Sequence, residues 1–118
     1  DSCLVGSEMC IRDSLRAMES DLGKRMKPLR VDGGAAANDL LMQIQADVLG
    51  RRLVRPAVIE TTVAGACYLA GLGAGLWEGP AQVKAMWAAE REFSVGMSPA
   101  ARRKRHASWS QAVQRTLM

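Results

Sequence analysis

A pair of glycines, Gly33 and Gly34, constrains this chain more than any other feature, because it stands between a short apolar run and an amphipathic one. The run "LRVD" (29–32) predicts a β-strand, and apolar residues recur with helical spacing over 35–49. Nothing bulkier than alanine follows the glycines until Asn38. Glycine at a strand-to-helix junction permits backbone angles that other residues avoid, and it lets a ligand touch the main chain. The pair therefore predicts either a tight turn or a backbone that closely approaches a ligand.

Phosphate is the ligand that such a junction suits best. The helix that follows directs free amide N–H groups and a partial positive charge at the turn. Asn38, in the first turn of the predicted helix, either reaches a ribose or base or serves the start of the helix. Neither GxGxxG nor GxxxxGK[ST] occurs, so the sequence has no dinucleotide fingerprint and no P-loop. From local pattern alone, the tight turn and the phosphate site both stay open.

The rest of the chain alternates helical and extended patterns. Helical spacing ends at Gly23, a second strand is predicted over 51–56, and a helix over 60–77 has Thr61 or Thr62 as its expected N-cap. Further helices are expected after Pro80 and after Pro99. The inner face of the last helix is expected to hold Trp109, Ala112, Val113, Thr116 and Leu117.

The predicted order is helix, strand, helix, strand, helix, helix, helix, which indicates an α/β fold. A two-stranded sheet leaves unpaired edges and exposed faces that a complete domain normally covers. The pattern therefore predicts part of a larger domain.

The stretch 61–77 carries no charged residue, which raises the question of a membrane span. It is as short as a span can be, and four glycines dilute its hydrophobicity. We expect a buried helix instead, with Cys67 behaving as a small hydrophobic residue within it. We also expect no secretory signal, because the first residues lack the basic start and apolar core that such a signal needs.

The cysteine and histidine content argues against a metal site. Three cysteines form no CxxC, and the chain has one histidine, so a zinc site has little support. We expect a reduced, cytoplasmic setting.

Net charge of +4 comes largely from the run 102–105, Arg-Arg-Lys-Arg. A basic run without interleaved aromatic residues is typical of a solvated helix face, and less typical of a nucleic-acid interface. We expect no nucleic-acid partner, with a small basic nucleic-acid-binding module as the alternative.

Several separated strings together resemble a known family. They are "LRVDGGAAANDLLMQIQADVLGRRLVRP", "ETTVAGACYLAGLGAGLWEG", "EREFSVGM" and "ASWSQAVQR". Over about 14–117 the chain resembles the C-terminal domain of the glycerol kinases, within the FGGY carbohydrate kinases. Other FGGY sugar kinases keep the Gly-Gly turn but match "VDGGAAAN" and "RPAVIETT" less well, so a fragment of another FGGY sugar kinase is the alternative.

The resemblance implies a partial RNase H-like domain of the actin-like ATPase fold, truncated at its N-terminal side. It implies that the backbone of Gly34 lies against a bound nucleotide, that Gly33 supports the same turn, and that Asn38 lies near the adenosine. The full-length enzymes use ATP and Mg²⁺ to convert glycerol to glycerol 3-phosphate, and they assemble as homo-oligomers. The catalytic aspartate and the glycerol-binding residues lie upstream in the family, so the resemblance assigns no catalytic residue and no metal ligand here.

Two segments depart from the family pattern. Ala101 stands where some bacterial relatives have a glutamate that helps bind an intermolecular zinc with a sugar-transport phosphocarrier, so we expect no such regulation. Residues 1–13 do not resemble the family's helix, although Arg12 and Asp13 fit it. We interpret 1–13 as a non-native leader, such as translated sequencing adaptor, and 14–118 as the family domain; Cys3 and Cys10 then have no role.

Overall fold

The structure, a computed structural model, describes residues 8–26 and 28–118. Its elements follow one another as α1 (Glu8–Leu22), β1 (Leu29–Arg30), the 3-10 helix η2 (Gly34–Ala37), α2 (Asp39–Leu49), β2 (Leu53–Pro56), α3 (Thr61–Gly73), α4 (Pro80–Ala85), β3 (Ala89–Phe93) and α5 (Pro99–Thr116). The α/β fold class is confirmed. The predicted leader lies mostly outside the described residues, and its expected boundary at 13 and 14 falls inside α1.

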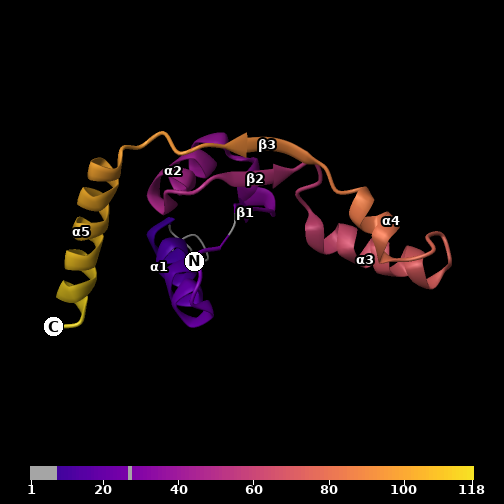
Figure 1. The fold of residues 1–118 in the computed structure, drawn as a ribbon, viewed down its shortest axis with the longest axis horizontal. Helices are drawn as coiled ribbons and strands as arrows, with labels where there is room; N and C mark the ends of the chain where they lie inside the picture. Colours follow the sequence, from indigo (N-terminus) through magenta and orange to yellow (C-terminus); the bar gives the residue numbers. More distant parts are fainter. Residues whose placement is uncertain (1–7, 27) are drawn as a thin grey trace.

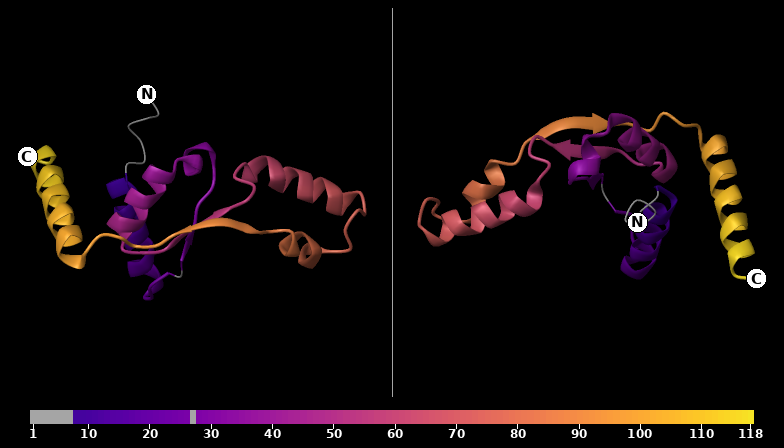
Figure 2. Two further views of the ribbon diagram at one scale, coloured as in Figure 1. Left: turned by 90° about the horizontal axis from the view of Figure 1, so that it is seen from above. Right: turned by 180° about the vertical axis from the view of Figure 1, so that it is seen from behind.

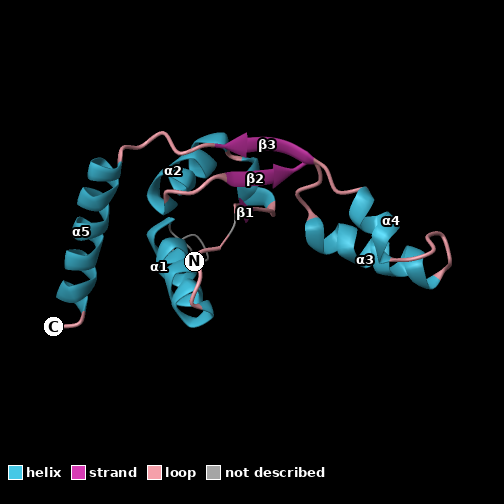
Figure 3. Ribbon diagram, viewed as in Figure 1, coloured by secondary structure: helices cyan, strands magenta, loops and turns pink. Residues whose placement is uncertain are grey.

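A three-stranded mixed sheet forms the centre of the molecule (Figure 3). β2 lies in the middle, parallel to β1 through the pair Leu29 and Leu53, and antiparallel to β3 through the pair Leu53 and Phe93. The parallel pair requires a crossover connection, and η2 with α2 supplies it.

The strand β3 was not predicted, and the expectation of only two strands is wrong. Its sequence, "AEREF", has three charged residues in five and no run of β-branched residues. Four of its residues are exposed, and charge on an edge strand discourages pairing with other chains. Pairing with β2 holds this segment extended, and that contact cannot be read from the local sequence.

The helix predicted over 35–49 is divided in the structure. Residues Gly34–Ala37 form η2, and α2 begins only after Asn38, whose backbone is extended. Gly50 ends α2 in the left-handed conformation with φ 65°, as expected of a C-terminal glycine. The strands are shorter than the predicted ranges 29–32 and 51–56.

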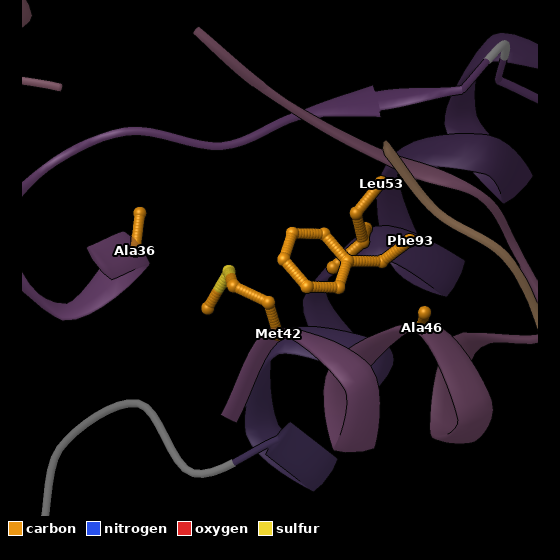
Figure 4. Close-up of a cluster of buried hydrophobic side chains, with 5 residues drawn as sticks. All are labelled: Ala36, Met42, Ala46, Leu53 and Phe93. Carbon is orange, nitrogen blue, oxygen red and sulfur yellow. The ribbon is translucent and has the colours of Figure 1, made fainter. Parts of the chain in front are cut away.

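The buried core is small and lies between α2 and the sheet. Figure 4 shows Met42 and Phe93 side by side, with Leu53 behind them. Its members are Ala36, Met42, Ala46, Leu53 and Phe93. Because η2, α2, β2 and β3 all contribute to it, this cluster fixes the position of η2 and the turn that precedes it.

Two helical arms extend from opposite ends of the sheet (Figures 1 and 2). One arm is the pair α3 and α4, and the other is α5; β3 connects them across the sheet. The Cα radius of gyration is 17.4 Å, whereas a compact chain of this length has about 13.5 Å. The accessible surface is 8428 Å², roughly 2,000 Å² more than a compact protein of this mass exposes. The arms therefore present about as much extra surface as a large protein interface buries.

The expectation that 61–77 is buried is wrong for this chain. In α3 only Gly71 is buried, and Cys67 is exposed, because α3 extends away from the sheet in an arm where, among the described helices, α4 lies beside it (Figure 1). Trp77 folds back over Gly71, where a Cβ would lie 2.1 Å from the indole ring. Within the described residues, no helix is both long and apolar enough to cross a membrane.

Two local predictions about helix starts have different outcomes. Neither Thr61 nor Thr62 is the N-cap of α3; Glu60 is, without a side-chain hydrogen bond. Pro80 is confirmed in the first turn of a helix, and the helix predicted after Pro99 begins at Pro99 itself.

The predicted inner face of α5 is mostly wrong. Trp109 is half-buried and donates from Nε1 to Asp13 of α1 at 2.7 Å. The other four predicted residues, 112, 113, 116 and 117, are exposed. The face that meets the rest of the protein is formed by Arg102, His106 and Trp109, which are spaced one helical turn apart.

Candidate nucleotide-binding site

The turn between β1 and η2 is built around Gly33. Its backbone has φ 87° and ψ 170°, a region that is essentially restricted to glycine. Its N–H donates to the carbonyl oxygen of Ile59 at 2.7 Å. This bond ties the turn after β1 to the loop after β2, so the turn is held from two strands.

Gly34 is glycine for a different reason. It begins η2 and does not have a positive φ, so its conformation is open to other residues. A Cβ built on Gly34 would meet nothing within 4 Å. Neither the backbone nor the packing of the described chain requires a glycine here. The missing side chain leaves an open approach to the main chain, which is the geometry that a ligand lying against the backbone needs.

Asn38 lies at the junction of η2 and α2, directly before α2, whereas the sequence predicted it inside the first turn of a helix over 35–49. Its Oδ1 accepts from the N–H of Leu41 at 3.1 Å, which makes it the N-cap of α2. The cap uses only the amide oxygen, and the side chain is exposed, so its two Nδ2 hydrogens can still face a ligand. The two roles weighed for Asn38 are therefore compatible with each other.

Asp32 and Thr61 form a hydrogen-bonded pair beside the turn. The Thr61 hydroxyl donates to the Asp32 carboxylate and so connects the start of α3 to the residue before Gly33. Sequence reasoning did not single out Asp32, although it directly precedes the glycine pair. The pair adds a second link between the two loops that form the edge of the site.

Arg55 supports η2 from the sheet and was also missed by sequence reasoning. Its NH1 donates to the carbonyl oxygen of Ala36 and to Asp39, both at 2.8 Å, while Nε donates to Glu90 at 2.8 Å. The hydrogen bonds that Arg55 donates, to Glu90 first and to Asp39 next, raise the pKa of Arg55 above its ordinary value. The hydrogen bond from Arg55 is also the main cause that lowers the pKa of Asp39. A charged residue in a central strand was the only signal in the sequence.

These contacts bring the predicted residues Gly33, Gly34 and Asn38 together along one exposed turn. Arg55 and the core fix the turn from below, and the space above Gly34 is open.

Comparison with known proteins identifies the family of the chain. Residues 2–74 match the sequence model of the FGGY family of carbohydrate kinases, C-terminal domain. The chain belongs to the FGGY carbohydrate kinases.

Among curated relatives, a glycerol kinase from Bdellovibrio bacteriovorus is 52% identical over 103 residues, covering 87% of this chain and 21% of the relative. A glycerol kinase from Dechloromonas aromatica is 53% identical over 105 residues, covering 89% of this chain and 21% of the relative. This FGGY chain thus spans about a fifth of the length of the curated relatives, and it matches the C-terminal domain of glycerol kinases.

Solved structures agree in fold. The crystal structure of Plasmodium falciparum glycerol kinase with ADP superposes with a TM-score of 0.79 and 29% identity, covering 94% of this chain and 22% of that one. A ligand-bound xylulose kinase from Lactobacillus acidophilus superposes with a TM-score of 0.58 at 15% identity, covering 77% of this chain and 19% of that one. The fold is therefore that of an FGGY C-terminal domain, of the actin-like ATPase type.

The basic run of this FGGY chain is only partly a solvated face. Arg102 is half-buried against α2, where a Cβ on Gly50 would meet its guanidinium at 1.8 Å. Residues 103–105 are exposed. In the described part of the chain, no group of three or more histidine, cysteine, aspartate or glutamate side chains is placed to hold a metal ion.

Proposed function

We propose that this chain is the nucleotide-binding C-terminal part of a glycerol kinase, the enzyme that transfers the γ-phosphate of ATP to glycerol. The open space beside Gly34 carries the proposal, because the fold of the chain does not account for a glycine there. The two curated relatives, 52% and 53% identical to this chain, are glycerol kinases, and the Plasmodium falciparum glycerol kinase structure was solved with ADP.

In this proposal the turn holds the nucleotide by its main chain. Gly34 lets the nucleotide touch the backbone, Gly33 supplies the angles that the turn needs, and Nδ2 of Asn38 faces the adenosine side. The link from Gly33 to Ile59 keeps the turn rigid, so little ordering is needed on binding.

We propose that the rest of the full-length enzyme and the nucleotide phosphates supply the ligands of Mg²⁺. Mg²⁺ would neutralise charge on the transferred phosphoryl group in the full-length enzyme. We propose that the catalytic base and the glycerol pocket also come from the rest of that enzyme, and that residues 14–118 form the family domain.

The first test is a coupled assay with glycerol or a pentulose as acceptor. Full-length enzyme should consume ATP with glycerol, and the 118-residue chain should show no turnover. Glycerol-dependent ATP consumption by the 118-residue chain would overturn the proposal that the catalytic base and the glycerol pocket come from the rest of the enzyme. A preference of the full-length enzyme for the pentulose would overturn the choice of substrate.

The second test is ADP binding, measured by titration calorimetry on the full-length enzyme. Gly34→Val should weaken ADP binding, whereas Gly73→Val should not, because Gly73 is also surrounded by open space but lies at the end of α3. Equal affinities for the Gly34 variant and wild type would refute the site.

A cytoplasmic location, assembly into homo-oligomers, and the absence of nucleic-acid and membrane partners complete the proposal. Size-exclusion chromatography with light scattering tests the assembly, and a monomer at micromolar concentration would contradict it.

A further inference from the structure

We propose that a basic cavity at the opposite end of α2 from the nucleotide turn binds a phosphate group, either free phosphate or that of a phosphomonoester. The cavity has a volume of about 210 Å³ and lies between α1, the end of α2 and α5. The residues that carry the argument are Arg12, Arg16, Glu19, Arg25, Arg51 and His106. The eleven residues of α2 separate this cavity from the Gly33–Gly34 turn by about 16 Å.

The charges around the cavity do not balance. Four arginines line it, and arginine stays protonated at any physiological pH. Arg51 pairs with Glu19 at 2.5 Å, and Arg12 pairs with Asp13. Within residues 8–26 and 28–118, Arg16 and Arg25 have no ion pair. Glu19 lines the cavity, and Asp13 pairs with Arg12 from outside it; Arg25 also interacts electrostatically with Glu19, and Arg16 with Asp13. Four guanidinium groups against these two carboxylates leave two positive charges, which matches the charge of a phosphomonoester dianion.

Arg12, which fits the family's helix although it stands in the segment interpreted as a leader, provides a second, independent indication. Its side chain is only 7% exposed, yet its Nε has no hydrogen-bond partner within the described part of the chain. Buried charged donors are normally paired, and an unpaired one is costly. A phosphate oxygen in the cavity that Arg12 lines would supply the partner, since the planar guanidinium donates two parallel hydrogen bonds to such an oxyanion.

A purely structural role explains only part of the cluster. Arg51 donates to the carbonyl oxygen of Met26 at 2.7 Å, and His106 Nε2 lies 2.8 Å from the carbonyl oxygen of Val48. Those two residues therefore connect elements of the fold. Arg16 and Arg25 are exposed and make no such bond, so packing does not account for their position at the cavity.

The test is a titration of the 118-residue chain with inorganic phosphate and, separately, with methyl phosphate at constant ionic strength. His106 is the only histidine in the chain, so its ring proton signals report on the cavity wall without further assignment. We expect saturable shifts of these signals with a Kd of about 1 mM or tighter. Tighter binding of methyl phosphate would assign the site to a phosphomonoester, and tighter binding of phosphate would assign it to the free ion.

The matched variants remove equal charge from two places. The double variant R16Q/R25Q should weaken binding by about tenfold or more, because it removes both unpaired charges at the cavity. Both residues are exposed, so the fold should persist, which far-UV circular dichroism can check. The control R103Q/R115Q changes two exposed arginines of α5 and should alter binding by less than about twofold. An absence of saturable binding, unmoved His106 signals, or equal weakening in both variants would overturn the proposal.

Discussion

Replacing Gly33 and Gly34 separately by alanine tests which glycine is required by the backbone conformation and which is required for nucleotide binding. At Gly33 the backbone lies at φ 87° and ψ 170°, where a residue with a Cβ is strained by about 1–3 kcal/mol. At Gly34 the backbone is ordinary and a Cβ meets nothing within 4 Å. We therefore expect Gly33→Ala to lower the free energy of unfolding by about 1–3 kcal/mol, and Gly34→Ala to change it by less than about 0.5 kcal/mol.

Nucleotide affinity should respond differently to the same two changes. If the nucleotide lies against the backbone of Gly34, an added methyl group would crowd this contact and weaken the binding free energy by about 1–3 kcal/mol. That cost corresponds to a roughly 5- to 150-fold increase in the Kd for ADP. Gly73→Ala, at another glycine with open surroundings, should leave this Kd unchanged.

The assays are urea unfolding followed by circular dichroism and ADP titration by calorimetry, applied to the same preparations. Equal loss of stability in the Gly33 and Gly34 variants would refute the strain argument. Wild-type ADP affinity in Gly34→Ala would refute the assignment of the open space to the nucleotide.

Three further substitutions test the rest of the site and the core. Asn38→Ala should lower the free energy of unfolding by about 1 kcal/mol, because the N-cap of α2 is lost, whereas Asn38→Asp should keep that stability and weaken ADP binding. The hydrogen bond from Arg55 lowers the pKa of Asp39 in the folded state. Asp39 therefore stabilises the fold at pH values above its unfolded pKa near 3.8, and this stabilisation is lost as the pH falls through the lower folded pKa. Asp39→Asn should flatten this part of the plot of unfolding free energy against pH. Leu53→Ala should lower the free energy of unfolding by about 2–5 kcal/mol, since Leu53 is fully buried, and Leu69→Ala should have an effect below about 0.5 kcal/mol, since Leu69 is 72% exposed.

Each of these predictions has a clear contrary result. Equal unfolding curves for Asn38→Ala and wild type would show that the cap does not stabilise α2. An unchanged acid profile in Asp39→Asn would show that its ion pairs are absent in solution. Similar losses of unfolding free energy in Leu53→Ala and Leu69→Ala would show that Leu53 does not belong to the buried core.

The arrangement of Arg55 shows what could not be read from local sequence. Its partners, Ala36, Asp39 and Glu90, come from segments up to 35 residues away, and they meet only because β2 lies between η2 and β3. The charged segment of β3 carries no strand pattern of its own, so its pairing with β2 was equally hidden. Long-range pairing depends on the whole sheet, whereas periodicity reports only on neighbours along one segment.

Local chemistry alone determined the Gly33 turn, the glycine stop of α2 at Gly50 and the proline starts of α4 and α5. Those features depend on backbone angles that a single residue type permits or requires. Tertiary structure alone decided that α3 lies exposed and that four arginines gather around one cavity. Burial and charge clustering depend on which segments meet in space, and that meeting depends on the packing of the whole fold.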